Sequence, residues 1–215
     1  MKFAELLEIV ADEPVFETGF LRGGRAPEPG LQAQLSRWCA AGKLLRLRRG
    51  LFALAPPYRK AHPHPFLVAN RLSPGSYVSG LSALAFANAI PEYVPEVTSC
   101  GPARPHVRET PLGRFSFRYV KPSLRTGYRL VDLVDGQSAF VARPEKAFLD
   151  LAHLQPGGDA PAWIDELRLD VDDLSPARLR AMAAATGSPK LARAAAHLIR
   201  RASDPAPPYE PLPVT

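Results

Sequence analysis

The chain has 215 residues, a formal net charge of +6 and a pI near 9.6. Nearly half of the residues are apolar, which excludes a wholly disordered chain and leaves room for one large or two small domains. Two cysteines, Cys39 and Cys100, exclude a disulfide scaffold and a four-cysteine zinc site. Acids in the first eight residues argue against a signal peptide, and we expect a cytoplasmic protein without membrane contact.

Three helices and a hairpin are predicted at the start of the chain. Apolar side chains at helical spacing predict a helix over residues 2–11, and residues 17–22 fit a short second helix. Leu31, Leu35 and Trp38 form the apolar face of a third helix that ends near Gly42. Two short apolar runs, 44–49 and 51–54, flank Gly50 and indicate a β-hairpin. This order predicts a winged helix-turn-helix over residues 1–58.

The excess charge lies in this first unit. Residues 20–60 hold nine bases and one acid, which is typical of a surface that binds phosphate. The third helix would be the recognition helix, and the hairpin would be the wing. The side chains expected to contact DNA are Gln32, Gln34, Ser36 and Arg37 on the helix and Lys43, Arg46, Arg48 and Arg49 at the wing. The alternatives are that these are ordinary solvated residues, or that the wing packs on protein.

A proline-rich joint leads to a second unit, residues 66–202, predicted to be a mixed α/β domain that ends in helices. Strands are expected at 77–78, 96–100, 115–120, 130–133 and 138–141, and helices at 66–72, 79–88, 145–155, 160–169, 176–186 and 190–202. Alternation predicts that Phe115, Phe117 and Tyr119 face inward, and Ser175 is the expected cap of the helix that follows it. The apolar face of the helix over 145–155 is expected to hold Ala147, Phe148, Leu151 and Leu154. Five prolines in residues 203–215 predict a disordered tail. The expected fold class is therefore α+β.

Several other side chains carry groups that bind ligands or react in other proteins. Basic residues in the second unit could form another surface for nucleic acid or a toxin, or only a solvated strand face; they are Arg104, Arg108, Arg114 and Arg118. His62 and His64 lack partners for a metal site, and Cys100 stands in no nucleophile motif. Glu145 and Lys146 most simply fit the dipole of a helix start facing solvent, and the alternative is a structural ion-pair role. We therefore expect no catalytic residue, metal or cofactor, and no enzymatic activity.

Three segments, in order, resemble the AbiEi family of bacterial antitoxins and transcriptional regulators. They are the wing, Gly42–Leu54; Tyr77-Val78-Ser79 with Ser82-Ala83-Leu84 and Ile90-Pro91-Glu92; and Ala142–Leu151, which is similar to the family's TPEKALLDL stretch. Departures are Asn88-Ala89, where His-Gly is common, and Arg143, where threonine is common.

The resemblance implies a repressor that binds its own operator and counteracts a nucleotidyltransferase toxin encoded beside it. Direct contact with that toxin is left open. One alternative is a winged-helix regulator whose second domain senses a ligand or protein and opposes no toxin. Another is an RNA-binding module in residues 66–202. The sequence does not support a nucleotidyltransferase, because no pair of acidic residues follows Gly75-Ser76 closely.

Overall fold

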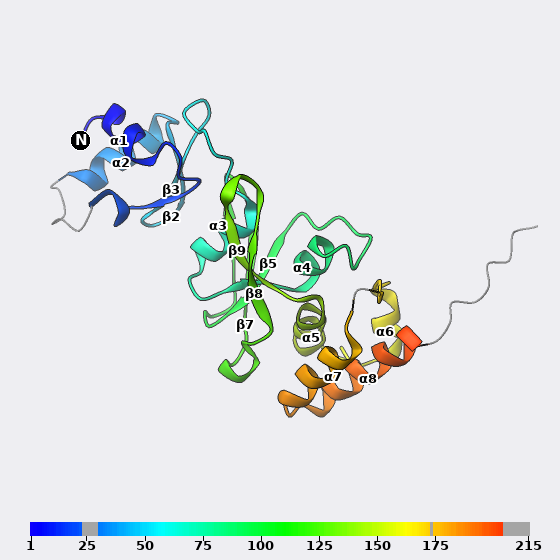
Figure 1. Cartoon of the computed structure of the whole chain (residues 1–215). Helices are drawn as coiled ribbons and strands as arrows, with labels where there is room; N and C mark the ends of the chain where they lie inside the picture. The colour runs from blue at the N-terminus through cyan, green and yellow to red at the C-terminus, as the bar shows by residue number, and fades with distance from the viewer. Residues whose placement is uncertain (23–29, 173, 204–215) are drawn as a thin grey trace, which may run out of the picture.

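The computed structural model describes residues 1–22, 30–172 and 174–203, and these form an α+β protein (Figure 1). The first unit holds helix α1 (Phe3–Val10), strand β1 (Phe16–Glu17), the 3-10 turn η1 (Phe20–Arg22), helix α2 (Leu31–Ala40) and strands β2 (Leu44–Arg48) and β3 (Leu51–Leu54). Most of the predicted tail lies outside the described residues. No helix in the described ranges is long and apolar enough to span a membrane.

A three-stranded antiparallel sheet, in the order β1-β3-β2, supports α1 and α2. The apolar faces predicted for the two helices are confirmed: Leu6, Val10 and Leu35 are fully buried and share one core with Phe52 and Leu54. The predicted helix over 17–22 is wrong in its first half. Phe16 and Glu17 pair with β3, because the apolar β3 needs a partner on its second edge, and only residues 20–22 turn helically.

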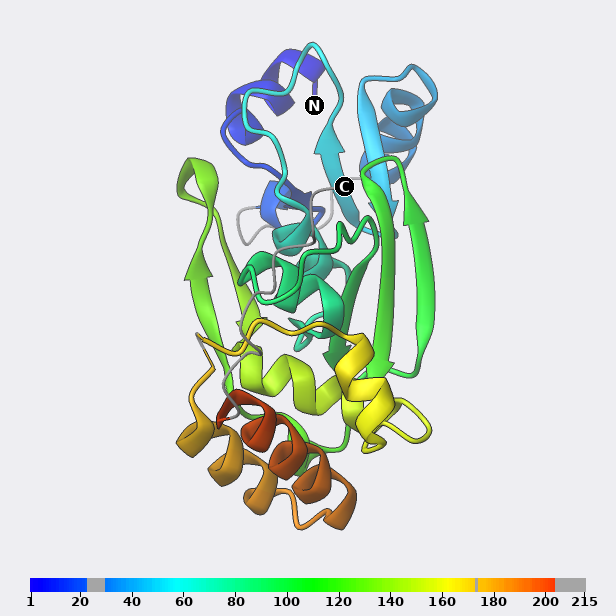
Figure 2. The same cartoon turned by 90° about the vertical axis from the view of Figure 1, so that its right-hand side faces the viewer.

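The hairpin lies between the two units. One side of it carries Leu44 and Phe52 into the core under α1 and α2. The other side carries Leu47, Leu51 and Ala53 into the larger core of the second unit. Gly50 has φ of +78°, which explains why a glycine stands at the turn. The two units are therefore packed against each other through this small sheet (Figure 2).

The second unit is built on a six-stranded mixed sheet in the order β6-β7-β5-β4-β9-β8. Its strands are β4 (Tyr77–Val78), β5 (Val97–Gly101), β6 (His106–Thr110), β7 (Gly113–Tyr119), β8 (Tyr128–Asp132) and β9 (Ser138–Ala142), with 3-10 turns η2 (Pro122–Leu124) and η3 (Val134–Gly136). Strand β6 was not predicted, because alternating polar residues at a sheet edge give a weak hydrophobic pattern. Tyr119 lies on the predicted inner face of β7 but is 47% exposed at the strand end.

Helices cover both faces of this sheet (Figure 1). Helix α3 (Pro65–Leu72) contacts β4, β5 and β9 on one face. Helices α4 (Gly80–Phe86) and α5 (Pro144–Leu154) pack together over the opposite face. The remaining helices, α6 (Pro161–Glu166), α7 (Pro176–Ala185) and α8 (Pro189–Ser203), pack beyond α5. The predicted cap at Ser175 is confirmed, because its hydroxyl accepts from Arg178 N at 3.3 Å.

Gln137 fastens the joint between the units. Gln137, which is 5% exposed, donates from Nε2 to His62 O and accepts from His64 N, both at 2.8 Å. Nδ1 of His64 in turn accepts from Phe66 N at 3.1 Å and caps α3. These contacts order the proline-rich stretch, so it holds the two units in one arrangement rather than acting as a loose linker.

Candidate nucleic-acid interface

Helix α2 presents a polar surface away from its core. Leu31 and Leu35 anchor the helix, so the residues between them point outward. Gln32, Ser36 and Arg37 are exposed, whereas Gln34 is half-buried and its Oε1 has no hydrogen-bond partner among the described residues. The structure thus brings three of the four predicted helix contacts onto one open face.

Cations lie beside this face. Arg46 is exposed on β2 and shares its strand side with Leu44, which packs under α2. Burial raises the pKa of the Cys39 thiol on α2, and the nearby charge of Arg46 acts in the opposite direction. In the described part of the chain, no carboxylate lies within ion-pair distance of Arg37, Arg46 or Arg49. These guanidinium groups are therefore available to an anion.

Lys43 is placed differently from the arginines. Its Nζ lies 4.7 Å from the centroid of the Phe3 ring on α1, within cation–π range. The charge remains partly accessible, since the residue is only half-buried. Lys43 thus ties the start of the hairpin to α1 while keeping positive charge near α2.

Arg48 turns inward, toward the second unit. Its Nη2 donates to Glu17 Oε1 at 2.8 Å, its Nε to Arg71 O at 3.2 Å, and its Nη1 to Arg49 O at 3.1 Å. Each nitrogen of this guanidinium therefore has a partner within the chain. A β-bulge between Arg46 and Arg48 separates the directions of these two side chains. Of the predicted wing residues, Arg46 and Arg49 form no ion pair within the described part of the chain, and Arg48 joins the units.

The four arginines predicted as a second surface are not brought together. Arg114 forms ion pairs with Glu96 at 2.6 Å and Glu109 at 2.5 Å, which neutralise it. Arg118 points to the same face of β7 as Arg114, whereas Arg108 on β6 pairs in register with Phe115 and points to the opposite face. Arg104 is exposed in the loop before β6. This set does not form one basic patch.

A buried polar cluster lies where β4 meets α5. Asp150 Oδ2 accepts from Tyr77 OH at 3.0 Å and from Ser79 Oγ at 2.7 Å, and Asp150 Oδ1 accepts from Lys146 Nζ. Lys146 and Asp150 are 5% and 1% exposed. The expectation that Lys146 faces solvent at a helix start is therefore wrong, because the side chain turns toward the sheet.

The chemistry of this cluster is structural. Burial and the Asp150 charge raise the pKa of the Tyr77 hydroxyl, which keeps it protonated and able to donate. Burial also raises the pKa of the Cys100 thiol, so it stays in the unreactive neutral form. The signal was present in the sequence: Lys146 and Asp150 stand four apart on one helix face, and Tyr77 and Ser79 two apart on one strand face.

Glu145, beside this cluster, fastens the C-terminal helices. It is completely buried, and its Oε1 accepts from Ser175 N at 2.9 Å and Arg178 Nη1 at 2.8 Å. Its expected exposure to solvent is also wrong. The helix α5 therefore connects the sheet, through Asp150, to the start of α7, through Glu145.

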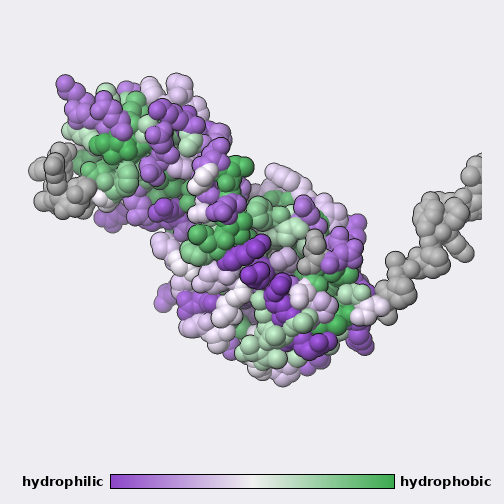
Figure 3. Space-filling view, in the orientation of Figure 1, coloured by the Kyte–Doolittle hydropathy of each residue, from purple (hydrophilic) through white to green (hydrophobic). Residues whose placement is uncertain are grey.

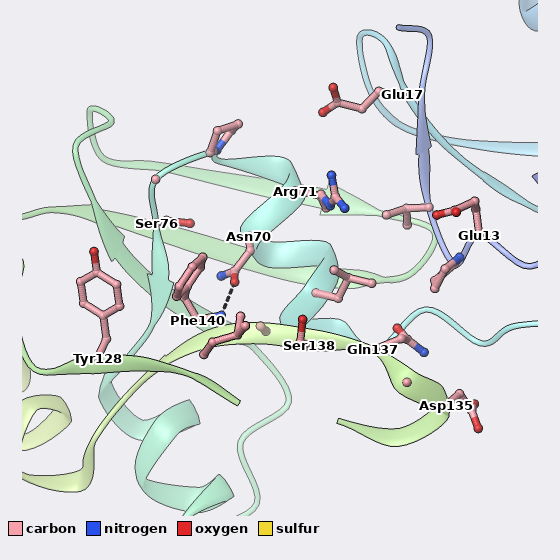
Figure 4. A pocket seen from close by; sticks show the side chains of 18 of the residues that line it. Glu13, Glu17, Asn70, Arg71, Ser76, Tyr128, Asp135, Gln137, Ser138 and Phe140 are labelled. Carbon is pink, nitrogen blue, oxygen red and sulfur yellow. Dashed lines mark hydrogen bonds between the residues drawn. The ribbon is translucent and has the colours of Figure 1, made fainter. Parts of the chain in front are cut away.

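A groove of about 790 Å³ opens where the two units meet (Figure 4). One wall comes from the segment between α1 and β1, and includes Glu13 and Glu17. The other comes from α3, the loop before β4 and the β8–β9 hairpin. Hydrophobic surface is visible at the narrow region between the units (Figure 3). Leu130, which lines the groove, is 56% exposed.

The described residues contain no group of three or more histidine, cysteine or acidic side chains placed to bind a metal ion. His62 lies 2.6 Å from Arg59 Nη2 and His64 caps α3, so each has another contact. No protein-family model matches the chain, and a search of curated proteins finds no significant relative.

Proposed function

We propose that residues 1–58 form a winged helix-turn-helix that binds double-stranded DNA. The order helix, strand, short helical turn, helix, strand, strand supports this proposal, as does the sheet order β1-β3-β2. In this arrangement α2 is the recognition helix and the β2–β3 hairpin is the wing.

The open face of α2 beside unpaired arginines is the observation that carries DNA binding. Gln32, Ser36 and Arg37 would reach base edges in the major groove, since amide, hydroxyl and guanidinium groups match their donors and acceptors. Arg46 and Arg49 would contact phosphates and fix the register of the protein on the duplex. Arg48 would take no part while it holds Glu17.

We infer that the whole chain is a bacterial repressor of its own operon and an antitoxin against a cognate nucleotidyltransferase. The ordered resemblance to AbiEi proteins supports this role. Its third segment, Ala142–Leu151, contains Glu145, Lys146 and Asp150, whose buried contacts build the second unit. The protein would act without a cofactor and without catalysis.

Two experiments test the two halves of this proposal. A gel-shift assay with DNA from upstream of the gene tests repressor binding, and Gln32→Ala and Arg37→Ala should relax its sequence preference. Co-expression with the neighbouring reading frame tests the antitoxin role. Failure of the chain to rescue growth from that neighbour would reject the antitoxin role. The repressor role would be rejected if the wild-type chain did not bind the upstream DNA.

The second candidate function is a DNA-binding regulator that senses a ligand and opposes no toxin. The groove between the units favours it, because a ligand there would contact both. The two candidates differ in their neighbouring gene and in co-expression, while both require DNA binding through α2.

A further inference from the structure

The groove between the units contains a narrow slot beside the shortest strand of the large sheet. Strand β4 has two residues and β9 has five, and they pair only at Val78 and Val141. Residues 138–140 of β9 therefore run past the start of β4 without a strand partner there. Asn70 on α3 replaces one of the missing strand contacts, because its Oδ1 accepts a hydrogen bond from Phe140 N at 2.6 Å.

Two polar groups at the slot have no partner. Ser76 is 4% exposed, and neither its hydroxyl nor Nδ2 of Asn70 has a hydrogen-bond partner among the described residues. Both residues line the groove, and their unpartnered atoms lie buried next to Phe140, so a ligand reaches them only when the Phe140 side chain turns aside (Figure 4). A buried polar group without a partner costs stability, so its presence calls for an explanation. A ligand that offers an acceptor to Asn70 and a partner to Ser76 would supply these missing bonds.

Aromatic rings flank the same space. Tyr128 and Phe140 lie 5.8 Å apart between ring centroids at an angle of 89°, and they are 38% and 45% exposed. Tyr128 is fixed from behind by stacking on Tyr77 at 4.4 Å. Phe140 is exposed enough to turn aside without loss of core packing. A planar ligand would gain a stacking surface on these rings.

The charge of the groove lining limits the class of ligand further. The groove is lined by four carboxylates and one guanidinium, but Glu17 pairs with Arg48 at 2.8 Å and Asp12 with Lys60 at 3.8 Å, so the excess left among the described residues is one negative charge. The charged side chains of the lining are Asp12, Glu13, Glu17, Asp135 and Arg71. Such a field disfavours phosphate and carboxylate ligands and admits neutral or cationic ones.

We propose that this slot binds a nucleoside, and that it disfavours the corresponding nucleotide. The base would stack on one of the two rings and meet the other edge-on, and its edge would accept from Asn70 Nδ2 and bond to the Ser76 hydroxyl. Base edges carry adjacent acceptors and donors suited to an amide and a hydroxyl. The site goes beyond DNA binding and toxin neutralisation and does not require either.

Calorimetric titration of the full chain, without DNA, tests the site. The probes are adenosine, guanosine, cytidine and uridine, each beside its 5′-monophosphate, at concentrations up to about 5 mM. We expect at least one nucleoside to bind, and its monophosphate to bind at least about tenfold more weakly. Ser76→Ala and Phe140→Ala should each lower the affinity for the nucleoside by about fivefold to tenfold.

Matched controls separate binding from folding. Ser99 Oγ is also buried without a partner but lies outside the groove, and Phe86 is 43% exposed on α4. Ser99→Ala and Phe86→Ala should keep wild-type nucleoside affinity. Ser76→Ala should keep or raise the melting temperature, since its buried hydroxyl has no partner among the described residues. The proposal is overturned if no nucleoside binds, if the monophosphates bind as tightly, or if Ser76→Ala and Phe140→Ala bind like their controls.

Discussion

Replacement of Asp150 by alanine is expected to be among the most destabilising single changes in the second unit. The carboxylate accepts three hydrogen bonds, from Tyr77, Ser79 and Lys146, and is 1% exposed. Asp150→Ala leaves the Lys146 ammonium buried without its counter-ion and two hydroxyls without their acceptor. Breaking a buried ion pair in this way costs about 3–5 kcal/mol. For a chain of this size that corresponds to a loss of about 6–20 °C in Tm.

Urea unfolding followed by circular dichroism measures this loss. Lys146→Met should cost less, because Asp150 keeps two of its three donors. The matched control is Glu92→Ala, which breaks the exposed pair with Arg168 at 2.9 Å and should cost at most about 1 kcal/mol. Equal losses for Asp150→Ala and Glu92→Ala would refute the reasoning, since they would show that the buried cluster is worth no more than a surface pair.

Three further predictions concern pH, backbone and the contact between the units. Burial lowers the pKa of His64, so its folded form resists protonation and stability should fall as pH drops below about 6.5. His64→Asn keeps a capping side chain and should flatten the Tm between about pH 7.5 and pH 5.5. Gly158→Ala should lower Tm, because a Cβ there would lie 2.4 Å from Ala152 O. Glu17→Gln should release Arg48 and strengthen non-specific DNA binding in fluorescence anisotropy.

Each of these has an outcome that would count against it. An unchanged pH profile in His64→Asn would show that another group controls the acid side, with His153, whose pKa burial also lowers, as the next candidate. A wild-type Tm for Gly158→Ala would show that the turn after α5 relaxes freely. Unchanged or weaker DNA binding in Glu17→Gln would mean that Arg48 contributes nothing once released.

The spacing of apolar residues predicted much of the fold. The directions and partners of the polar side chains at the site could not be predicted in the same way. The faces of α1 and α2 followed from apolar spacing, because burial imposes that spacing directly. The face predicted for α5 followed only in part, since Leu154 is 39% exposed and the helix is also buried at Glu145 and Asp150. The direction of Arg48 did not follow, because it depends on a β-bulge and on a carbonyl of α3 that lies 23 residues away.

The burial of Glu145 and Lys146 was missed for a related reason. A charged residue is ordinarily exposed, and only its partners in the folded chain make burial tolerable. Those partners are distant in sequence: Asp150 is held by residues of β4, and Glu145 by residues at the start of α7. The groove is likewise absent from any local pattern, because it forms between two units.

The salt dependence of DNA binding tests the central proposal most directly. Fluorescence anisotropy would compare the wild type with Arg46→Ala and Arg37→Ala on a labelled duplex from upstream of the gene, across a salt series. Arg168→Ala, an exposed arginine of the second unit, is the control. We predict that Arg46→Ala weakens binding and lowers the salt slope by about one, that Arg37→Ala weakens binding, and that Arg168→Ala changes nothing. Wild-type affinity and slope in Arg46→Ala and Arg37→Ala would contradict the account.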